Sequence, residues 1–313
     1  MYKFTPILKT LVWGTESWVL SGVPGSESVV AHGPDAGKKI TDIFPGQFPL
    51  LIKFIDAKRD LSIQVHPDDA LAMARHGCPG KTEMWYVIGA EPGAKLISGL
   101  RERITPSDYV RLVAEDRITD VLAEHSVSPG DVFYLPAGRI HAIGGGCYLA
   151  EIQQTSDITY RIYDYNRPGL DGKPRQLHTQ EAKDAIDYKV YPEYRTRYEP
   201  RQNEPVELVR CPYFTTTLYD LARRTEIPDQ DHPKNQRFPG APVVGDDDKT
   251  SFAGLTGESP FLIAIGLHGS GTIKTEQDET TLCEGEAVLI PASDGPVSFE
   301  PGPDGLRLLT THP

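Results

Sequence analysis

Four side chains of this sequence have the chemistry of metal ligands. His66 closes a strand-like segment that also contains Gln64, and Glu83 opens the next such segment. His141 follows a motif marked by glycine and proline, GDVFYLPAGRIH. Imidazole, carboxylate and amide groups without a thiolate suit zinc, iron, manganese or nickel, and water in a remaining position makes such a site catalytic in type. We therefore predict one metal site with four ligands: Gln64, His66, Glu83 and His141.

The spacing before His141 explains how a histidine becomes fixed in place. Residues 129–131 have turn chemistry, and residues 132–135 are a strand-forming run. Pro136 and Gly138 then end that strand and turn the chain. His141 is expected at the start of the next strand, where two rigid turns set the direction of its side chain.

The upstream segment LSIQVHP is predicted to be a strand that a proline closes. Strand alternation puts Ser62, Gln64 and His66 on one face and the apolar side chains on the other. Gln64 and His66 are therefore expected to project together toward a shared interior.

Short strands and turns dominate the rest of the chain, which has 29 glycines and 27 prolines. Lys53 lies within the apolar run 48–55, an unusual place because lysine is rarely buried without a partner. A helix is expected to begin after Asp68 and to end at Gly77. Residues 105–127 are predicted to form two short helices inserted between strands.

Residues 148–166 are rich in strand-forming side chains. If one strand runs through this segment, Glu151, Asp157 and Arg161 share a face. A surface ion pair is the simpler interpretation of Asp157 and Arg161 when these two residues are considered alone.

Composition excludes several classes of function. The net charge of −12 argues against nucleic acid or an anionic membrane as the main partner, although a local basic cluster can still bind an anionic small molecule. The amino end carries no apolar segment typical of a secretion signal, and no apolar run reaches the roughly 18 residues of a membrane span. A cytoplasmic protein is expected, and the sequence gives no basis for predicting its oligomeric state.

Long segments of the chain resemble a known family. The pattern G-x5-P-x-G-x2-H in residues 130–141 is similar to the second motif of the cupin superfamily. The segments LIKFIDAKRDLSIQVHPDD, GKTEMWYVIGAEPGAKLISGL, PGDVFYLPAGRIHAIGGG and EIQQTSDITYRIYDYNR resemble the short bacterial form of the mannose-6-phosphate isomerase (phosphomannose isomerase) family. The resemblance covers most of residues 1–190, and it implies a mainly β fold of two cupin-type jelly rolls with a small helical insertion.

The resemblance also implies a reaction. The family interconverts mannose 6-phosphate and fructose 6-phosphate, usually with zinc, which implies one Zn²⁺ per chain here. The predicted site suits this chemistry, because the isomerisation moves a proton between C1 and C2 through an enediolate whose charge a metal can stabilise.

Further residues are assigned by the same resemblance. Arg161, in TYRIYD, matches the catalytic arginine of the family, and an always-charged guanidinium can stabilise the enediolate. Glu151 and Asp157 match acidic residues of the pocket that could take part in proton transfer. Lys53 and Lys81 match pocket lysines, and the sequence leaves open whether they bind phosphate or transfer a proton.

Two further points concern the environment of the substrate. Ser62 faces the same way as the predicted ligands and could contact the phosphate. The longer form of the family has a histidine just before the lysine that matches Lys81, whereas Gly80 and Thr82 are the neighbours here. A role of that histidine therefore does not transfer to this chain.

A domain boundary is predicted in the polar, proline-marked segment near residue 200. Residues 1–200 would form the catalytic jelly roll with its helical insertion, and residues 201–313 a second jelly roll. Residues 285–292 repeat the spacing of residues 130–137, but no histidine follows at the matching place. The second jelly roll is therefore expected to lack a metal.

Two alternative functions fit the same residues. A metal-dependent oxygenase is possible on this type of fold, which carries many chemistries. A non-enzymatic sugar-phosphate sensor would keep the pocket without turnover. The cationic residues near the site favour the isomerase over the oxygenase, and the intact Arg161, Lys53 and ligand set favour it over the sensor.

Overall fold

The structure is a computed structural model that describes residues 1–44, 46–222, 225–226 and 259–313. The described chain divides into two compact units, each built from segments that are distant in sequence. The double-sheet unit comprises Pro6–Ser26 and Leu50–Thr196. The single-sheet unit comprises Met1–Thr5, Glu27–Pro49 and Arg197–Pro313.

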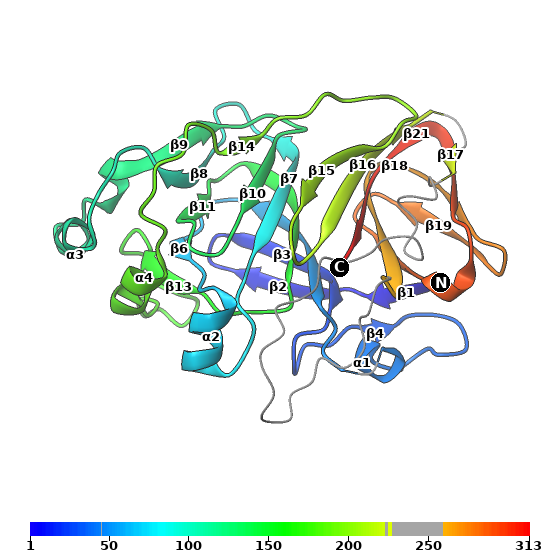
Figure 1. Cartoon of the computed structure of the whole chain (residues 1–313), viewed down its shortest axis with the longest axis horizontal. Coiled ribbons are helices and arrows are strands. Elements are labelled where there is room, and N and C mark those ends of the chain that lie inside the picture. Colours follow the sequence, from blue (N-terminus) through cyan, green and yellow to red (C-terminus); the bar gives the residue numbers. More distant parts are fainter. Residues whose placement is uncertain (45, 223–224, 227–258) are drawn as a thin grey trace. The chain divides into compact units, whose positions relative to one another are not determined.

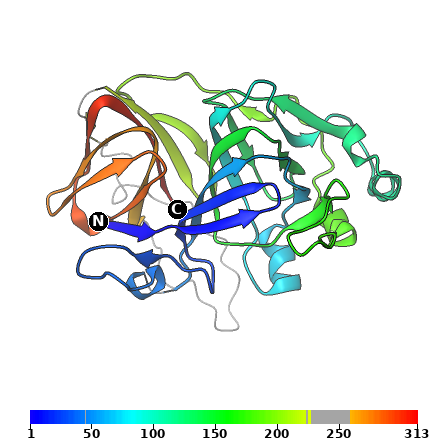
Figure 2. The same ribbon diagram turned by 180° about the vertical axis from the view of Figure 1, so that it is seen from behind.

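The larger sheet of the double-sheet unit contains seven antiparallel strands (Figure 1). The hairpin of its last two strands pairs over five residues and is seen most clearly from behind (Figure 2). In spatial order the strands are β14 (Arg195–Thr196), β10 (Val132–Leu135), β7 (Glu83–Ala90), β12 (Cys147–Gln154), β5 (Leu50–Ala57), β3 (Gly14–Ser21) and β2 (Ile7–Leu11).

The second sheet of this unit contains five antiparallel strands. It carries both predicted histidines, since His66 directly follows one of its strands and His141 begins another. In spatial order the strands are β13 (Tyr160–Tyr163), β6 (Ile63–Val65), β11 (His141–Ile143), β8 (Lys95–Leu100) and β9 (Leu122–Ser126).

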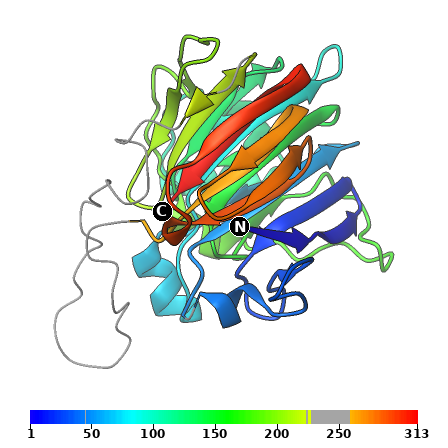
Figure 3. The ribbon, with the colours of Figure 1, turned by 90° about the vertical axis from the view of Figure 1, so that its right-hand side faces the viewer.

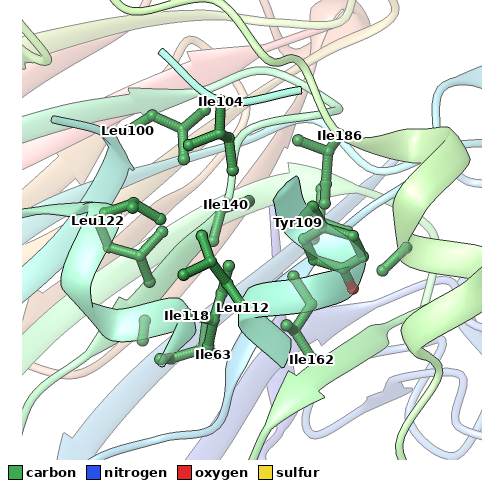
Figure 4. Packing of buried hydrophobic residues seen from close by; sticks show 14 of the residues in the cluster. Ile63, Leu100, Ile104, Tyr109, Leu112, Ile118, Leu122, Ile140, Ile162 and Ile186 are labelled. Carbon is green, nitrogen blue, oxygen red and sulfur yellow. The ribbon is translucent and has the colours of Figure 1, made fainter. Parts of the chain in front are cut away.

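Two apolar cores hold the double-sheet unit together. The inner core fills the space between the sheets, where Trp85 and Phe133 of the larger sheet pack with Leu96 and Ile143 of the smaller one. The outer core joins the smaller sheet to the helices and is shown in Figure 4. The smaller sheet is therefore buried on both faces, and its inward side chains lie in the interior of the unit.

The helices of this unit begin and end at the expected signals. Helix α2 (Asp69–His76) is capped by the Asp68 carboxylate and ends at Gly77, whose φ of 66° is left-handed. Helix α3 (Pro106–Ala114) begins at a Thr105 capping box with proline in its first turn. Helix α4 (Thr179–Ala185) completes the set.

The prediction of two helices in residues 105–127 is only half right. After α3 the chain makes a single 3₁₀ turn, η1 (Ile118–Val121), and then enters strand β9. Strand β9 pairs with β8, with Leu96 opposite His125. The apolar residues that indicated a second helix lie on one 3₁₀ turn, and the chain then continues as an edge strand of the smaller sheet.

Residues 148–166 do not form one continuous strand, so the shared face of Glu151, Asp157 and Arg161 that such a strand would give does not apply. Strand β12 ends at Gln154 in the larger sheet, and β13 begins at Tyr160 in the smaller one. The side-chain amide of Gln153 donates to the carbonyls of Gln154 and Ser156 and so stabilises the turn. Residues 155–159 therefore carry the chain from one sheet to the other.

The single-sheet unit is also mainly β, and its strands β18 and β21 lie side by side in Figure 3. Its described residues include two short helical turns, α1 (Ile40–Ile43) and η4 (Ala292–Asp294). The strands are β1 (Tyr2–Thr5), β4 (Val29–Val30), β15 (Val206–Arg210), β16 (Thr215–Leu221), β17 (Thr225–Glu226), β18 (Phe261–Lys274), β19 (Glu279–Cys283), β20 (Ala287–Pro291) and β21 (Ser298–His312).

The fold class is therefore mainly β and antiparallel, as predicted, and helices α2, α3 and α4 belong to the double-sheet unit. The functional division at residue 200 stays a prediction, and the amino end contributes segments to both compact units. A predicted exposed loop over residues 229–250 lies outside the described residues. Within the described part of the chain, no helix has both the length and the apolar character of a membrane span.

Leu112→Ala should destabilise the protein by about 2–5 kcal/mol, because it opens a cavity in the outer core. Leu112 is 5% exposed and packs in that core. Val110→Ala is the matched control on the same helix, since Val110 is 39% exposed and should change stability by about 0.5 kcal/mol or less. Denaturant unfolding of both variants checks the assignment, and equal losses would contradict it.

Candidate metal centre

Three of the four predicted ligands come together in the interior of the double-sheet unit. Glu83 Oε1 lies 3.2 Å from His141 Nε2, and Glu83 Oε2 lies 3.6 Å from His66 Nε2. The three ligand atoms all lie within 4.8 Å of one another, and the three side chains are buried. Strand β7 thus supplies the carboxylate, while the smaller sheet supplies both imidazoles.

The backbone fixes which ring nitrogen of each histidine faces the site. Nδ1 of His66 donates to the Ile158 carbonyl, and Nδ1 of His141 donates to the Arg139 carbonyl, both at 2.8 Å. Nε2 of each ring is therefore the unprotonated nitrogen and turns toward Glu83. Second hydrogen bonds of this kind orient metal-binding histidines.

Both imidazoles are held neutral. Burial and then the Lys81 ammonium lower the pKa of His66 well below its ordinary value. The same two causes lower the pKa of His141 to about 3. A neutral imidazole is the form that binds a metal, so these rings are in the protonation state of ligands at physiological pH.

Glu83 is the strongest indication that the site suits a cation. It is completely buried, and neither carboxylate oxygen makes a hydrogen bond of good geometry. Burial and then the nearby Glu151 raise the pKa of Glu83. The Lys81 ammonium lies 2.8 Å from Glu83 Oε2 and 3.1 Å from His66 Nε2, so these oxygens and nitrogens already attract a positive charge. A buried carboxylate between two neutral imidazoles fits a divalent metal ion.

Gln64 lies beside this group, as the strand alternation predicts. Its amide Nε2 is 3.3 Å from His141 Nε2, and Gln64 and His141 are directly opposite in the pairing of β6 with β11. Because the oxygen and nitrogen of an amide are interchangeable by a half-turn of the group, the Gln64 oxygen can face the same atoms.

Lys53 and Glu151 form a buried ion pair on the neighbouring strands β5 and β12. The ammonium lies 3.0 Å from Glu151 Oε1, and the two residues are directly opposite in the sheet. The Trp85 indole donates to Glu151 Oε2 at 2.8 Å. The unusual lysine of the sequence is thus buried with a partner.

The charges of this pair are fixed by their mutual attraction. Burial would lower the pKa of Lys53, but Glu151 and Glu16 outweigh it and raise that pKa above its ordinary value. Burial would raise the pKa of Glu151, but Lys53 and Lys81 hold it below its ordinary value. Lys53 is therefore charged near neutral pH, which suits it to bind anionic oxygens rather than to act as a general base.

Glu151→Gln should cost about 3–5 kcal/mol of stability near neutral pH, because it leaves the buried Lys53 charge unpaired. The pKa of Glu151 is lowered in the folded protein from an ordinary value of 4.5. The unfolded chain is therefore protonated first, and the stabilisation is present above that value and is lost as the pH falls below it. The stability difference between wild type and variant should shrink by up to about 1.4 kcal/mol per pH unit in this range.

Denaturant unfolding at a series of pH values checks this prediction. Glu124→Gln is a matched control, because Glu124 pairs with Lys95 on the surface, where 56% of its side chain is exposed. This control should show a small difference that does not vary with pH. A pH-independent difference for Glu151→Gln would contradict the assignment.

Arg161 lies next to the candidate ligands on the smaller sheet. It is directly opposite Gln64 in the pairing of β13 with β6, and its Nε donates to Ser62 Oγ at 3.3 Å. Its Nη1 donates to the Gln176 carbonyl at 2.9 Å. Burial and then Arg175 lower the pKa of Arg161, although a guanidinium keeps its charge. The structure therefore brings Arg161 and Ser62 together beside the predicted ligand Gln64.

Asp164 organises the segment that holds Arg161. Its buried carboxylate accepts hydrogen bonds from the guanidinium groups of Arg167 and Arg175, the latter through both Nε and Nη2 at 2.7 and 2.6 Å. Arg175 precedes Gln176, whose carbonyl accepts from Arg161. The sequence analysis missed this support, since nothing local in YDYNRPGLDGKPRQ indicates that one aspartate binds two arginines.

The remaining predicted residue, Asp157, is exposed in the crossing between the sheets. The negative charge of Asp157 acts to raise the pKa of Lys53 and that of Lys9 on strand β2. Glu16 and Trp18 of strand β3 also lie beside Lys53, and sequence reasoning missed them. The sequence signal that could have indicated them is their spacing, because Glu16 and Trp18 are two positions apart on a strand and therefore lie on the same face.

Two hollows of the unit lie away from this group. One, of about 400 Å³, is lined by Asp68, Leu71 and Asp184, and the other, of about 440 Å³, by Arg101, Asp108 and Arg117. Neither is lined by a predicted site residue. We place the candidate chemistry at the buried side chains between the sheets, because the charge and ligand geometry lie there.

The fold and the site together define a class, a mainly β protein with a candidate metal site between two antiparallel sheets. Residues 13–83 match the model of the family described as phosphomannose isomerase type I, catalytic domain. The mannose-6-phosphate isomerase of Streptococcus mutans is 30% identical over 309 residues, covering 95% of this chain and 88% of that protein. The chain belongs to the mannose-6-phosphate isomerase family of enzymes.

Other relatives extend this similarity along the chain. The mannose-6-phosphate isomerase ManA of Bacillus subtilis is 29% identical over 327 residues, covering 95% of each chain. The crystal structure of the mannose 6-phosphate isomerase from Bacillus subtilis is similar with a TM-score of 0.83 and 28% identity, covering 100% of this chain and 99% of that one. The family and fold expected from the sequence are thus confirmed.

Proposed function

We propose that this protein interconverts mannose 6-phosphate and fructose 6-phosphate as a metal-dependent aldose–ketose isomerase. The observation that carries the proposal is the buried Glu83 carboxylate between the Nε2 atoms of His66 and His141. Arg161 beside this group supports a reaction that builds negative charge on two neighbouring sugar oxygens. Membership in the family supports the choice of substrate.

We propose zinc as the metal, one ion per chain. His66, Glu83 and His141, with the amide oxygen of Gln64, would hold it. When bound, the ion supplies a Lewis acid that polarises the oxygens of the substrate. The neutral imidazoles and the buried carboxylate support this choice but suit other divalent metals as well.

The chain's own residues would orient the sugar and move its proton. In the proposed reaction a proton leaves C2 of the aldose and is returned to C1, through an enediolate. Arg161 would stabilise the enediolate oxygens, because the hydrogen bonds that it donates to Ser62 Oγ and to the Gln176 carbonyl fix the direction of its guanidinium. Glu151 and Asp157 are our candidates for the proton transfer.

The lysines and Ser62 are proposed to contact oxygens of the substrate. Lys53 is charged and lies on the larger sheet, whereas Lys81 lies among the predicted ligands. Ser62 is buried beside Arg161, which places a hydroxyl donor next to a guanidinium. We propose contacts with substrate oxygens from all four side chains: Lys53, Ser62, Lys81 and Arg161.

A substrate panel tests the proposed function. The metal-loaded protein should convert mannose 6-phosphate to fructose 6-phosphate and should be far less active on free mannose, which lacks the phosphate dianion. A sensor would bind mannose 6-phosphate without converting it, and an oxygenase would consume oxygen. Absence of turnover in fully metal-loaded protein would reject the isomerase.

A further inference from the structure

A row of polar side chains crosses one face of the larger sheet and ends at Lys9. Residues directly opposite in an antiparallel pair lie on the same face. Glu151 is opposite Lys53, Lys53 is opposite Trp18, and Glu16 is opposite Lys9. Because Glu16 and Trp18 are two positions apart on strand β3, all five side chains lie on the same face.

Lys9 reaches back over the neighbouring strand. Its Nζ lies 3.2 Å from the ring centroid of Trp18, which is buried, and the Lys53 ammonium lies 5.0 Å from the same centroid. The Trp18 indole donates to Glu16 Oε2 at 2.6 Å, so the ring itself is fixed. The two ammonium groups therefore share one aromatic side chain beside the candidate site.

Lys53 and Lys9 differ in whether a carboxylate contacts the ammonium group. Lys53 lies 3.0 Å from Glu151, whereas Lys9 has no carboxylate within 4.0 Å among the described residues. A cation–π contact positions an ammonium without neutralising it. Burial lowers the pKa of Lys9, and the charges of Asp157 and Glu16 oppose that change.

We propose that Lys9 binds the phosphate dianion of the substrate, at the end of this row away from Glu83. The inference rests on the proposed function and adds to it a residue that determines specificity for phosphorylated sugars. An ammonium on a flexible stem binds a phosphate as a point charge, and the half-buried surroundings of Lys9 strengthen that attraction. The chain has a net charge of −12, so binding a dianion requires a local positive charge. The Lys9 ammonium supplies one on this face, because no carboxylate contacts it among the described residues.

Replacement of Lys9 tests the proposal. Lys9→Met should raise the KM for mannose 6-phosphate and the inhibition constant of inorganic phosphate by about tenfold to a hundredfold, with kcat changed by about twofold or less. Lys9→Arg keeps the charge and should recover most of the affinity. Lys58→Met is the matched control, because Lys58 is exposed and pairs with Asp56, and both constants should stay unchanged.

A binding measurement separates this inference from the isomerase itself. Calorimetric titration of metal-loaded protein with inorganic phosphate needs no turnover, and Lys9→Met should weaken binding by the same factor. If the wild type failed to isomerise the sugar while Lys9→Met still lost phosphate, the function would fail and the phosphate site would stand. Unchanged phosphate affinity and unchanged KM in folded Lys9→Met protein, or in folded Lys9→Gln should the first variant not fold, would overturn the inference.

Discussion

His141→Ala should lose its metal and reduce kcat about a thousandfold or more. A bound metal would contribute several kcal/mol of stabilisation to charge that develops in the proposed reaction. His141 Nε2 faces Glu83, and its Nδ1 is tied to the backbone, so the substitution removes one of the three buried ligand atoms of the group. Metal analysis of the purified variant and its rate with mannose 6-phosphate check both parts of the prediction.

The matched control is His125→Ala. His125 lies on strand β9 of the same sheet, is half-buried and hydrogen-bonds to the Ser98 carbonyl, and it is not part of the group formed by His66, Glu83 and His141. This variant should keep its metal and nearly all of its activity. A His141→Ala protein that retained full metal occupancy and wild-type kcat would remove His141 from the site.

Arg161→Ala should lower kcat by about a hundredfold to a thousandfold, the usual effect of removing one preorganised donor to a developing oxyanion. Metal content should be unchanged, because Arg161 is not among the predicted ligands. Arg161→Lys keeps the charge but loses the planar fork, so it should recover only part of the rate. Steady-state kinetics with mannose 6-phosphate measure these effects.

Arg111→Ala provides the control for removing a guanidinium from this unit. Arg111 is exposed on α3 and pairs with Asp108 and Glu115, so its loss should leave kcat within about twofold. If Arg161→Ala changed only the KM, with kcat intact, Arg161 would bind the ground state rather than stabilise the reaction's charge.

The local geometry of the ligands was predictable from the sequence, because short-range signals determine it. Gly130, Pro136 and Gly138 bracket a strand and set the start of the next one, so His141 was expected where it lies. Alternation likewise placed Gln64 and His66 on one side of β6. Leu61 is the exception, since it precedes β6 and packs in the inner core with the side chains between the sheets.

Long-range pairing explains what the sequence could not show. Lys53 was unusual in its apolar run, but its partner Glu151 lies far away in the sequence and becomes its neighbour only through the pairing of β5 with β12. Lys9 and Trp18 meet for the same reason, across the β2–β3 hairpin. No local composition marks such contacts, because each strand alone is compatible with several neighbours.

Arg161 combines a feature that was predictable from the sequence with one that depends on long-range contacts. The family resemblance identified it, and the structure places it next to Ser62. Its support by Asp164 and Arg175 depends on a loop that returns to β13, and a side-chain network of this kind has no periodic signature. The composition of residues 148–166 left open whether one strand runs through them, because a change of sheet leaves the strand-forming composition intact.

Rates before and after metal removal test the central claim most directly. The wild-type protein would be assayed for conversion of mannose 6-phosphate to fructose 6-phosphate as purified, after chelation, and after zinc is restored. We predict activity that is lost with the metal and returns with zinc, since Glu83, His66 and His141 are arranged to bind a cation. Full activity in metal-free protein, or none in fully loaded protein, would contradict the assignment of a metal-dependent isomerase.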